Sequence, residues 1–419
     1  MINRIKNWFF LFLKKTQKYT GTDNVYLVKG GFWLTFGQVA SAGVAFLVAL
    51  AFANLLDPAT YGNYNYILSL VEMLGILTLS GVWQAVNQAV ARGLEGSFYT
   101  GFKTKLRWGL LASLVALGAA IYYWLQGNQL LPIPLLIIAV FLPLMLASQL
   151  YSGFLLGRKL FNIQTKYNII TQIVCAAAIV VTMLFTKNLF WLIAIYFVSH
   201  TLSNYFFYRL TQKKFQPNRE EDPKTISYGR HLSLMGIINI AASQLDKLLL
   251  FTLTGSVELA VYSLASAIPE QISGILNNVS NLAFPKLATK SPQELKTTLI
   301  KKVWKFFLII IAIIIVYLLL APFVYKIFFP QYLASIVYSQ IAIFSLLALP
   351  TNLLNTAFQA QMMKKELYLL KLNGIIKLIL LVVLVPIYGI LGAVLAMTGA
   401  QILGAVLTLF LFYYSLRHA

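Results

Sequence analysis

The chain has 419 residues, of which 59% are hydrophobic and 11% charged, and it carries a formal net charge of +21 at pH 7. This composition excludes a soluble multidomain protein, so we expect an all-α polytopic membrane protein. The positive charge would suit a nucleic-acid partner, but basic residues of a membrane protein gather first in the inner loops, so their placement decides the matter.

The first 29 residues form a basic segment that holds a short aromatic run with Trp8, Phe9 and Phe12. The apolar run is too short for the core of a signal peptide. We expect either a helix that lies on the inner membrane surface, with Lys14 and Lys15 toward anionic lipid, or a disordered basic tail.

Hydropathy windows of about 20 residues predict twelve membrane spans. Their approximate ranges are 31–53, 66–86, 108–126, 132–156, 168–186, 190–208, 233–253, 259–284, 304–325, 336–358, 372–385 and 387–414. The only cysteine, Cys175, lies in the fifth span, so no intrachain disulfide can form.

The basic residues are strongly asymmetric about these spans. Of the 33 Lys and Arg residues, Lys187 and Lys326 fall in odd-numbered connections and Lys247 and Lys377 fall inside spans, which leaves 29 in the N-terminal segment, the even-numbered connections and the C-terminal tail. The positive-inside rule therefore predicts that both termini are cytoplasmic. Because the charge is spread over every inner loop, we expect no nucleic-acid partner.

The most polar connection divides the spans into six and six. We expect a cytoplasmic linker at residues 211–229 between an N-terminal half, residues 30–210, and a C-terminal half, residues 230–419. Short similarities between the halves, such as LLDPATYGNY with LTGSVELAVY, favour a parallel duplication with a central cleft between two six-helix bundles.

Two adjacent charges lie deep in the seventh span. Asp246 and Lys247 follow a run of apolar residues, and Asp246 is about two thirds of the way along the span. Charges at this depth are costly, so they face the protein interior or a water-filled path. Asn239, Ser243 and Asp246 share one helical face, whereas Lys247 points about 100° away from it.

Two later spans carry polar stripes. In the eighth span, Glu270 shares a face with Asn277 and Asn281, and in the tenth span Asn352 shares a face with Asn355. Such stripes either tie helices together or line a wet cavity, and the acid in the eighth span favours the cavity.

Three further intramembrane charges leave alternatives open. Glu72, in the second span, either pairs with Lys247 or Lys377 or takes part in proton or cation coupling. Lys247 and Lys377 either contact an anionic substrate such as a phosphate, or pair with a carboxylate or extend to the membrane surface.

Two stretches resemble known proteins. Leu56, Pro58, Tyr61, Gly62 and Tyr64 match a first-loop signature of bacterial polysaccharide exporters and O-antigen flippases, and Asp246, Gly255, Tyr262, Ala265 and Pro285 match the seventh and eighth spans of that family. The resemblance extends over nearly the whole chain. Where the family often has an arginine near the end of the second span, this chain has Gln84, Asn87 and Gln88.

The resemblance implies a flippase of the multidrug, oligosaccharidyl-lipid and polysaccharide exporter superfamily in the bacterial cytoplasmic membrane. The substrate would be an undecaprenyl-diphosphate-linked oligosaccharide, moved by alternating access and coupled to H+ or Na+, with Asp246, Glu72 or Glu270 as the coupling carboxylate. The expected partners are this lipid-linked substrate, membrane lipids and polysaccharide polymerase or assembly proteins.

The sequence is also compatible with three other functions. A cation-coupled drug exporter of the same fold usually has an acid in its first span, which this chain lacks. A membrane glycosyltransferase would need a sizeable outer loop, and the predicted outer loops are all short, so we expect no enzymatic activity. A non-transporting scaffold of polysaccharide assembly is a third alternative. We expect no cofactor, because no nucleotide-binding loop or metal-ligand cluster occurs.

Overall fold

The computed structural model describes residues 24–288, 292–361 and 363–415, and within them it does not describe the side chains of residues 24–29, 278–288, 292–298, 360, 364 and 415. Regular structure in the described residues is entirely helical. The helices are α2 (Asn24–Leu55), α3 (Pro58–Gly75), η1 (Ile76–Thr78), α4 (Val82–Ala91), α5 (Ser97–Leu125), α6 (Pro132–Ser148), α7 (Leu150–Gly157), α8 (Phe161–Phe185), α9 (Leu189–Phe215), α10 (Thr225–Leu253), α11 (Ser256–Ala288), α12 (Pro292–Phe328), η2 (Pro330–Tyr332), α13 (Ser335–Ala342), η3 (Ile343–Thr351), α14 (Asn352–Ala360), α15 (Lys364–Leu370) and α16 (Leu372–Ser415).

These helices contain the predicted number of membrane spans. Ten stretches of the described residues are long and apolar enough to cross a membrane, and the bent pair formed by residues 58–78 and 82–91 makes an eleventh. The predicted surface helix at the N-terminus lies largely in residues 1–23, outside the described part of the chain.

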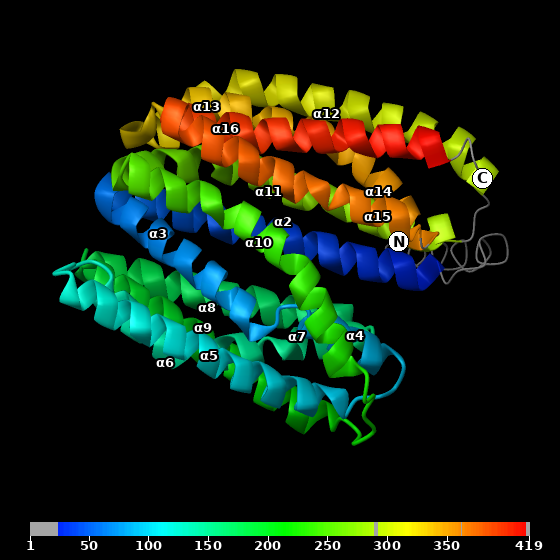
Figure 1. The fold of residues 1–419 in the computed structure, drawn as a ribbon, viewed down its shortest axis with the longest axis horizontal. Helices are drawn as coiled ribbons and strands as arrows, with labels where there is room; N and C mark the ends of the chain where they lie inside the picture. Colours follow the sequence, from blue (N-terminus) through cyan, green and yellow to red (C-terminus); the bar gives the residue numbers. More distant parts are fainter. Residues whose placement is uncertain (1–23, 289–291, 362, 416–419) are drawn as a thin grey trace, which may run out of the picture.

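The twelfth span comes from α16, which is two helices joined at a turn. Its 44 residues would extend over about 66 Å if straight, roughly twice the bilayer core. Gly389, with φ at 55° and ψ at −126°, interrupts the helix, and Asn373 then lies against Gly404 while Leu380 lies near Gly399. Residues at nearly equal distances along the chain from Gly389 therefore face each other, and Figure 1 shows the orange and red arms running side by side.

The second predicted span is broken rather than straight. Asp57 caps α3 by accepting a hydrogen bond from the Thr60 backbone N–H, and Pro58 occupies the first turn, where its missing N–H costs nothing. Leu79 then adopts a left-handed backbone, with φ at 56°, and the chain turns by 54° into α4. The span therefore begins eight residues before the predicted Tyr66, and its second part lies at an angle to the first.

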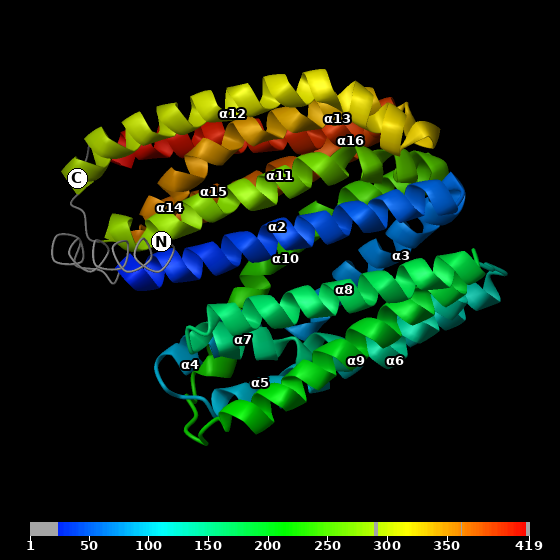
Figure 2. The ribbon, with the colours of Figure 1, turned by 180° about the vertical axis from the view of Figure 1, so that it is seen from behind.

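Figures 1 and 2 show two groups of helices, α4–α9 and α11–α16, with α2, α3 and α10 between them. α10 packs against α3 and α4 as well as α16, and α3 packs against α10 and α11. The two groups are therefore joined by helices that contact both of them. At one end, Gly62 lies so close to the Ser256 carbonyl that a Cβ would overlap it, so this approach requires glycine.

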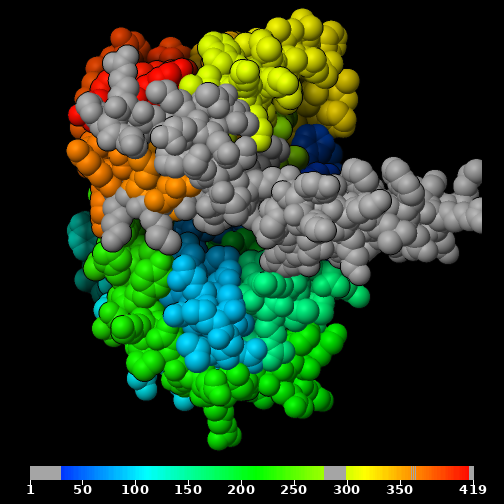
Figure 3. Space-filling model, turned by 90° about the vertical axis from the view of Figure 1, so that its right-hand side faces the viewer, coloured from blue at the N-terminus to red at the C-terminus, as the bar shows by residue number. Residues whose placement is uncertain are grey.

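The opposite end of the molecule carries the connection between α9 and α10, residues 216–224, and we call it the linker end. Figure 3 views this end, with residues of the first group, coloured blue to green, below those of the second, coloured yellow to red. Because α9 continues to Phe215 and α10 begins at Thr225, the non-helical connection is shorter than the predicted linker at 211–229.

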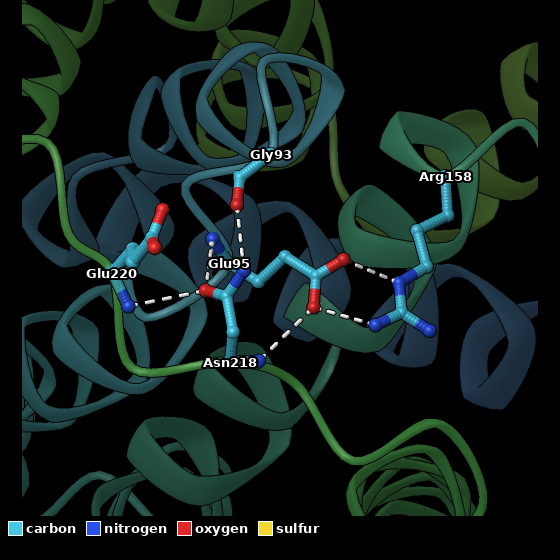
Figure 4. Close-up of polar contacts among 5 residues, drawn as sticks. All are labelled: Gly93, Glu95, Arg158, Asn218 and Glu220. Carbon is cyan, nitrogen blue, oxygen red and sulfur yellow. Dashed lines mark hydrogen bonds and ion pairs between the residues drawn. The ribbon is translucent and has the colours of Figure 1, made fainter.

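A network of hydrogen bonds attaches this connection to the loop between α4 and α5 (Figure 4). Glu95 accepts two hydrogen bonds from the Arg158 guanidinium and a third, at 3.1 Å, from the Asn218 backbone. The Asn218 side chain donates to the Gly93 carbonyl and accepts from the Glu220 backbone N–H. Burial raises the pKa of Glu95, but the bonds from Arg158 and Asn218 outweigh it and hold that pKa below its ordinary value of 4.5.

Candidate functional site

The central cavity lies between the two groups of helices and has a volume of about 460 Å³. Residues from α2, α3, α8, α9, α10 and α11 line it, so both predicted halves contribute. Aromatic rings of Phe52, Tyr61 and Tyr64 form part of its wall. The polar part of the lining consists of Ser41, Asn65, Gln172, Tyr196, His200, Lys247, Ser263, Ser266, Glu270 and Gln271.

Asp246 is buried outside this cavity, with 3% of its surface exposed. Its carboxylate accepts hydrogen bonds from the Tyr262 hydroxyl at 2.8 Å and the Lys377 ammonium at 3.3 Å, on the neighbouring helices α11 and α16. The Lys247 backbone N–H donates a third bond at 2.8 Å. A buried carboxylate that is both paired and hydrogen-bonded is stable in its charged form, so this cluster holds three helices together.

Lys247 points away from Asp246 into the central cavity, as the sequence predicted from its 100° rotation about the helix. It belongs to none of the three ion pairs found among the described residues. It lines the central cavity together with Glu270, and the two form no ion pair. Glu72 forms an ion pair with neither Lys247 nor Lys377. Lys377 is bonded to Asp246, and Lys247 takes part in no ion pair of the described residues.

Glu72 and Glu270 face cavities rather than packed protein. Each side chain is accessible to water although both lie within membrane-spanning helices. Glu270 lines the central cavity, and Glu72 lines a second cavity of about 470 Å³. Tyr196 lines both cavities, so the two are neighbours.

The polar stripes of the eighth and tenth spans meet each other. The Asn352 side chain donates to Asn277 at 2.8 Å, and Asn277 and Asn355 extend the chain of bonds to Ser273 and Asn352. This part of both stripes therefore ties α11 to α14, which was the alternative to a cavity lining. Asn281 lies where side chains are not described.

One part of the tenth-span stripe does reach a cavity. Asn355 and Lys377 line a third cavity of about 330 Å³ between α10, α14, α15 and α16. The buried Oδ1 atoms of Asn355 and Asn373, which line the same cavity, have no hydrogen-bond partner. These two oxygen atoms can therefore accept hydrogen bonds from water or from a polar ligand in this cavity.

The helix of the third span begins well before the predicted residue 108. α5 begins at Ser97, so Lys105 lies two turns inside the helix, where only 6% of its surface is exposed. A pattern in the sequence could have revealed it: Ser97, Gly101, Lys105 and Gly109 recur at every fourth position, which marks one packed helical face. No group of three or more His, Cys, Asp or Glu side chains that could hold a metal occurs among the described residues.

Comparison with solved structures identifies the fold. A MATE in complex with Br-NRF has a TM-score of 0.63 at 13% identity, with 94% of this chain and 96% of that one covered. An inward-facing multidrug resistance MATE family transporter of the MOP superfamily has a TM-score of 0.64 at 11% identity, with 92% and 98% covered. A MOP superfamily transporter from Pyrococcus furiosus has a TM-score of 0.63 at 14% identity, with 93% and 96% covered. The chain is thus a multi-pass membrane protein with the MATE transporter fold.

The family follows from the sequence. The model of the polysaccharide biosynthesis protein family matches residues 27–289, which is more than half of the chain. The chain belongs to this family, and the resemblance found in its motifs is confirmed. Comparison with curated protein sequences gave no match.

Proposed function

We propose that this protein moves a lipid-linked oligosaccharide, of the undecaprenyl-diphosphate class, across the cytoplasmic membrane of a bacterium. The family supports a role in polysaccharide biosynthesis, and the fold supports movement of a substrate across the membrane. The observation that carries the proposal is the central cavity, where polar groups and the cation of Lys247 are placed between the two groups of helices.

The chemistry of the cavity suits each part of this substrate. Hydroxyl, amide and phenol groups can exchange hydrogen bonds with sugar hydroxyls, and the Lys247 ammonium can hold a phosphate. The lipid tail can remain in the bilayer. Movement of residues 30–210 against 230–419 would open the cavity alternately to the two sides, with both chain termini in the cytoplasm.

An ion gradient drives this movement in our proposal. Of the three candidate carboxylates, Asp246 already has a cation, because Lys377 is bonded to it. Glu270 and Glu72 face cavities and are free to bind H+ or Na+, so we assign the coupling role to Glu270 first and to Glu72 second. Lys247 is then the substrate contact, and Lys377 positions Asp246.

The test is flipping of a fluorescent undecaprenyl-diphosphate oligosaccharide by the purified protein in proteoliposomes, with and without a proton or sodium gradient. We expect protein-dependent exposure of the glycan on the opposite side, accelerated by one of the two gradients. Absence of movement for several glycans, together with gradient-driven efflux of cationic dyes, would identify a drug exporter instead.

A further inference from the structure

Lys105 is a buried cation in the first group of helices that lacks a counter-charge. It takes part in none of the hydrogen bonds or ion pairs of the described residues. Glu72 lines the same cavity but forms no ion pair with Lys105. A buried charge without a direct partner is costly, and no hydrogen bond or ion pair of the described residues offsets this cost.

The space beside Lys105 is a built cavity. The bend between α3 and α4 contributes Thr78, Ser80 and Trp83, and the junction of α6 with α7 contributes Gln149. Neither the Ser80 hydroxyl nor the Gln149 amide takes part in a hydrogen bond within the described residues, so both can donate to a ligand. A volume of about 470 Å³ leaves room for a head group as well as water.

The position of the cavity limits what can enter it. Lys105 is eight residues from the start of α5, or about 12 Å from the linker end of that helix. This depth is close to where lipid head groups meet the hydrocarbon core. A phosphate-bearing lipid could therefore place its head beside Lys105 while its tail stays in the membrane.

We propose that Lys105, with Ser80 and Gln149, binds the phosphate head group of a membrane lipid at the linker end. This inference rests on the proposed function where the lipid is the prenyl-diphosphate-linked substrate; a phospholipid head group offers the same chemistry. Because Tyr196 lines both this cavity and the central one, a phosphate released from Lys105 meets Lys247 next. Lys105 thus serves as an entry site and Lys247 as the deeper site.

The test uses the full chain in detergent, with farnesyl diphosphate as probe and farnesol as the uncharged control. We expect farnesyl diphosphate to bind and to raise the Tm, and farnesol to do neither. Lys105→Gln should weaken diphosphate binding by about 10-fold or more, because a charge-assisted hydrogen bond is lost. Without ligand, its Tm should equal or exceed that of the wild type, since an unpaired buried cation is gone; a lysine that supports the fold would give the opposite sign.

Three variants serve as controls. Lys103→Gln, at an exposed position on the same helix, should bind like the wild type. Lys105→Arg should retain the preference for diphosphate. Gln149→Leu should also weaken binding of farnesyl diphosphate. If Lys105→Gln does not fold, Gln149→Leu tests the proposed site in its place. Wild-type affinity of Lys105→Gln, or of Gln149→Leu in that second case, would overturn the proposal.

Competition identifies the source of the phosphate. Displacement of farnesyl diphosphate by phosphatidylglycerol would make a phospholipid the occupant, and failure to displace it would favour the prenyl diphosphate. If the wild type flips no glycan but binding still depends on Lys105, the proposed function is wrong and the phosphate site at Lys105 is supported. If Lys105→Gln binds farnesyl diphosphate and flips the glycan like the wild type, the phosphate site at Lys105 is wrong and the proposed function is unaffected.

Discussion

The two groups of helices differ in whether an intramembrane lysine has an ion-pair partner. In the second group, Lys377 is bonded to Asp246, which also accepts a bond from Tyr262. In the first group, Lys105 is more deeply buried than many apolar residues and has no such partner among the described residues. Charge at membrane depth therefore has two uses in this protein: a paired charge holds helices together, and an unpaired one is available to a ligand.

The largest effect should follow from breaking the paired site. Asp246→Ala leaves the largely buried Lys377 ammonium without its counter-charge, and we expect a loss of about 3–5 kcal/mol in the free energy of unfolding. Denaturant unfolding of the purified protein measures it. The double variant Asp246→Asn, Lys377→Met should regain most of this loss, because the orphan charge is gone. If Asp246→Ala lost no stability, as we expect for Lys105→Gln, the distinction between the two sites would be wrong.

Removal of the cavity-facing lysine should affect transport rather than stability. We expect Lys247→Ala to lower glycan flipping in proteoliposomes by about 10- to 100-fold, since the phosphate loses a charge-assisted hydrogen bond. Lys247→Arg should retain much of the activity, and Lys301→Ala, at an exposed position on α12, should behave as the wild type. Unchanged flipping by Lys247→Ala would show that the substrate does not use this cation.

The coupling carboxylate should be separable from the substrate contact. We expect Glu270→Gln to lose gradient-driven acceleration of flipping by about 5-fold or more while slow, gradient-independent movement continues. Glu72→Gln should show the smaller loss of the two. The rate with and without an imposed gradient measures both, and a full gradient response in each variant would exclude these residues as the coupling groups.

The smallest effect should come from the linker network, where Glu95 is buried but its partner Arg158 is partly exposed to water. Because the folded-state pKa of Glu95 is lowered, its contribution is fully present above its ordinary value of 4.5 and is lost as the pH falls below that value. We expect about 1 kcal/mol, measured as hydrogen-exchange protection of the Asn218 and Gly96 backbone N–H groups. The profile of Glu95→Gln should be flat over this range, and equal slopes in variant and wild type would exclude Glu95 as the titrating group.

Much of the architecture could be predicted from apolar run lengths alone. Twelve spans were predicted, and the structure has them once the arms of α16 on either side of Gly389 are counted separately. The bend at Leu79 was not predicted, because Leu79 is neither proline nor glycine, and the contact of Gly81 with Ser233 beside the bend joins residues 152 positions apart. The polar stripe of the eighth span was found, but its division into a cavity lining at Glu270 and a bonded part at Asn277 was not.

The sequence by itself determined the membrane class, the number of spans and that Asp246 faces away from lipid, because each depends on local hydropathy and helical period. Only the tertiary structure decided that Lys377 is the partner of Asp246, 131 residues away along the chain, and that Lys247 faces a cavity. It also decided that Lys105 is buried without a counter-charge. A lysine looks the same in a sequence whether or not a carboxylate reaches it, and in this chain that contact alone distinguishes a structural charge from one available to a ligand.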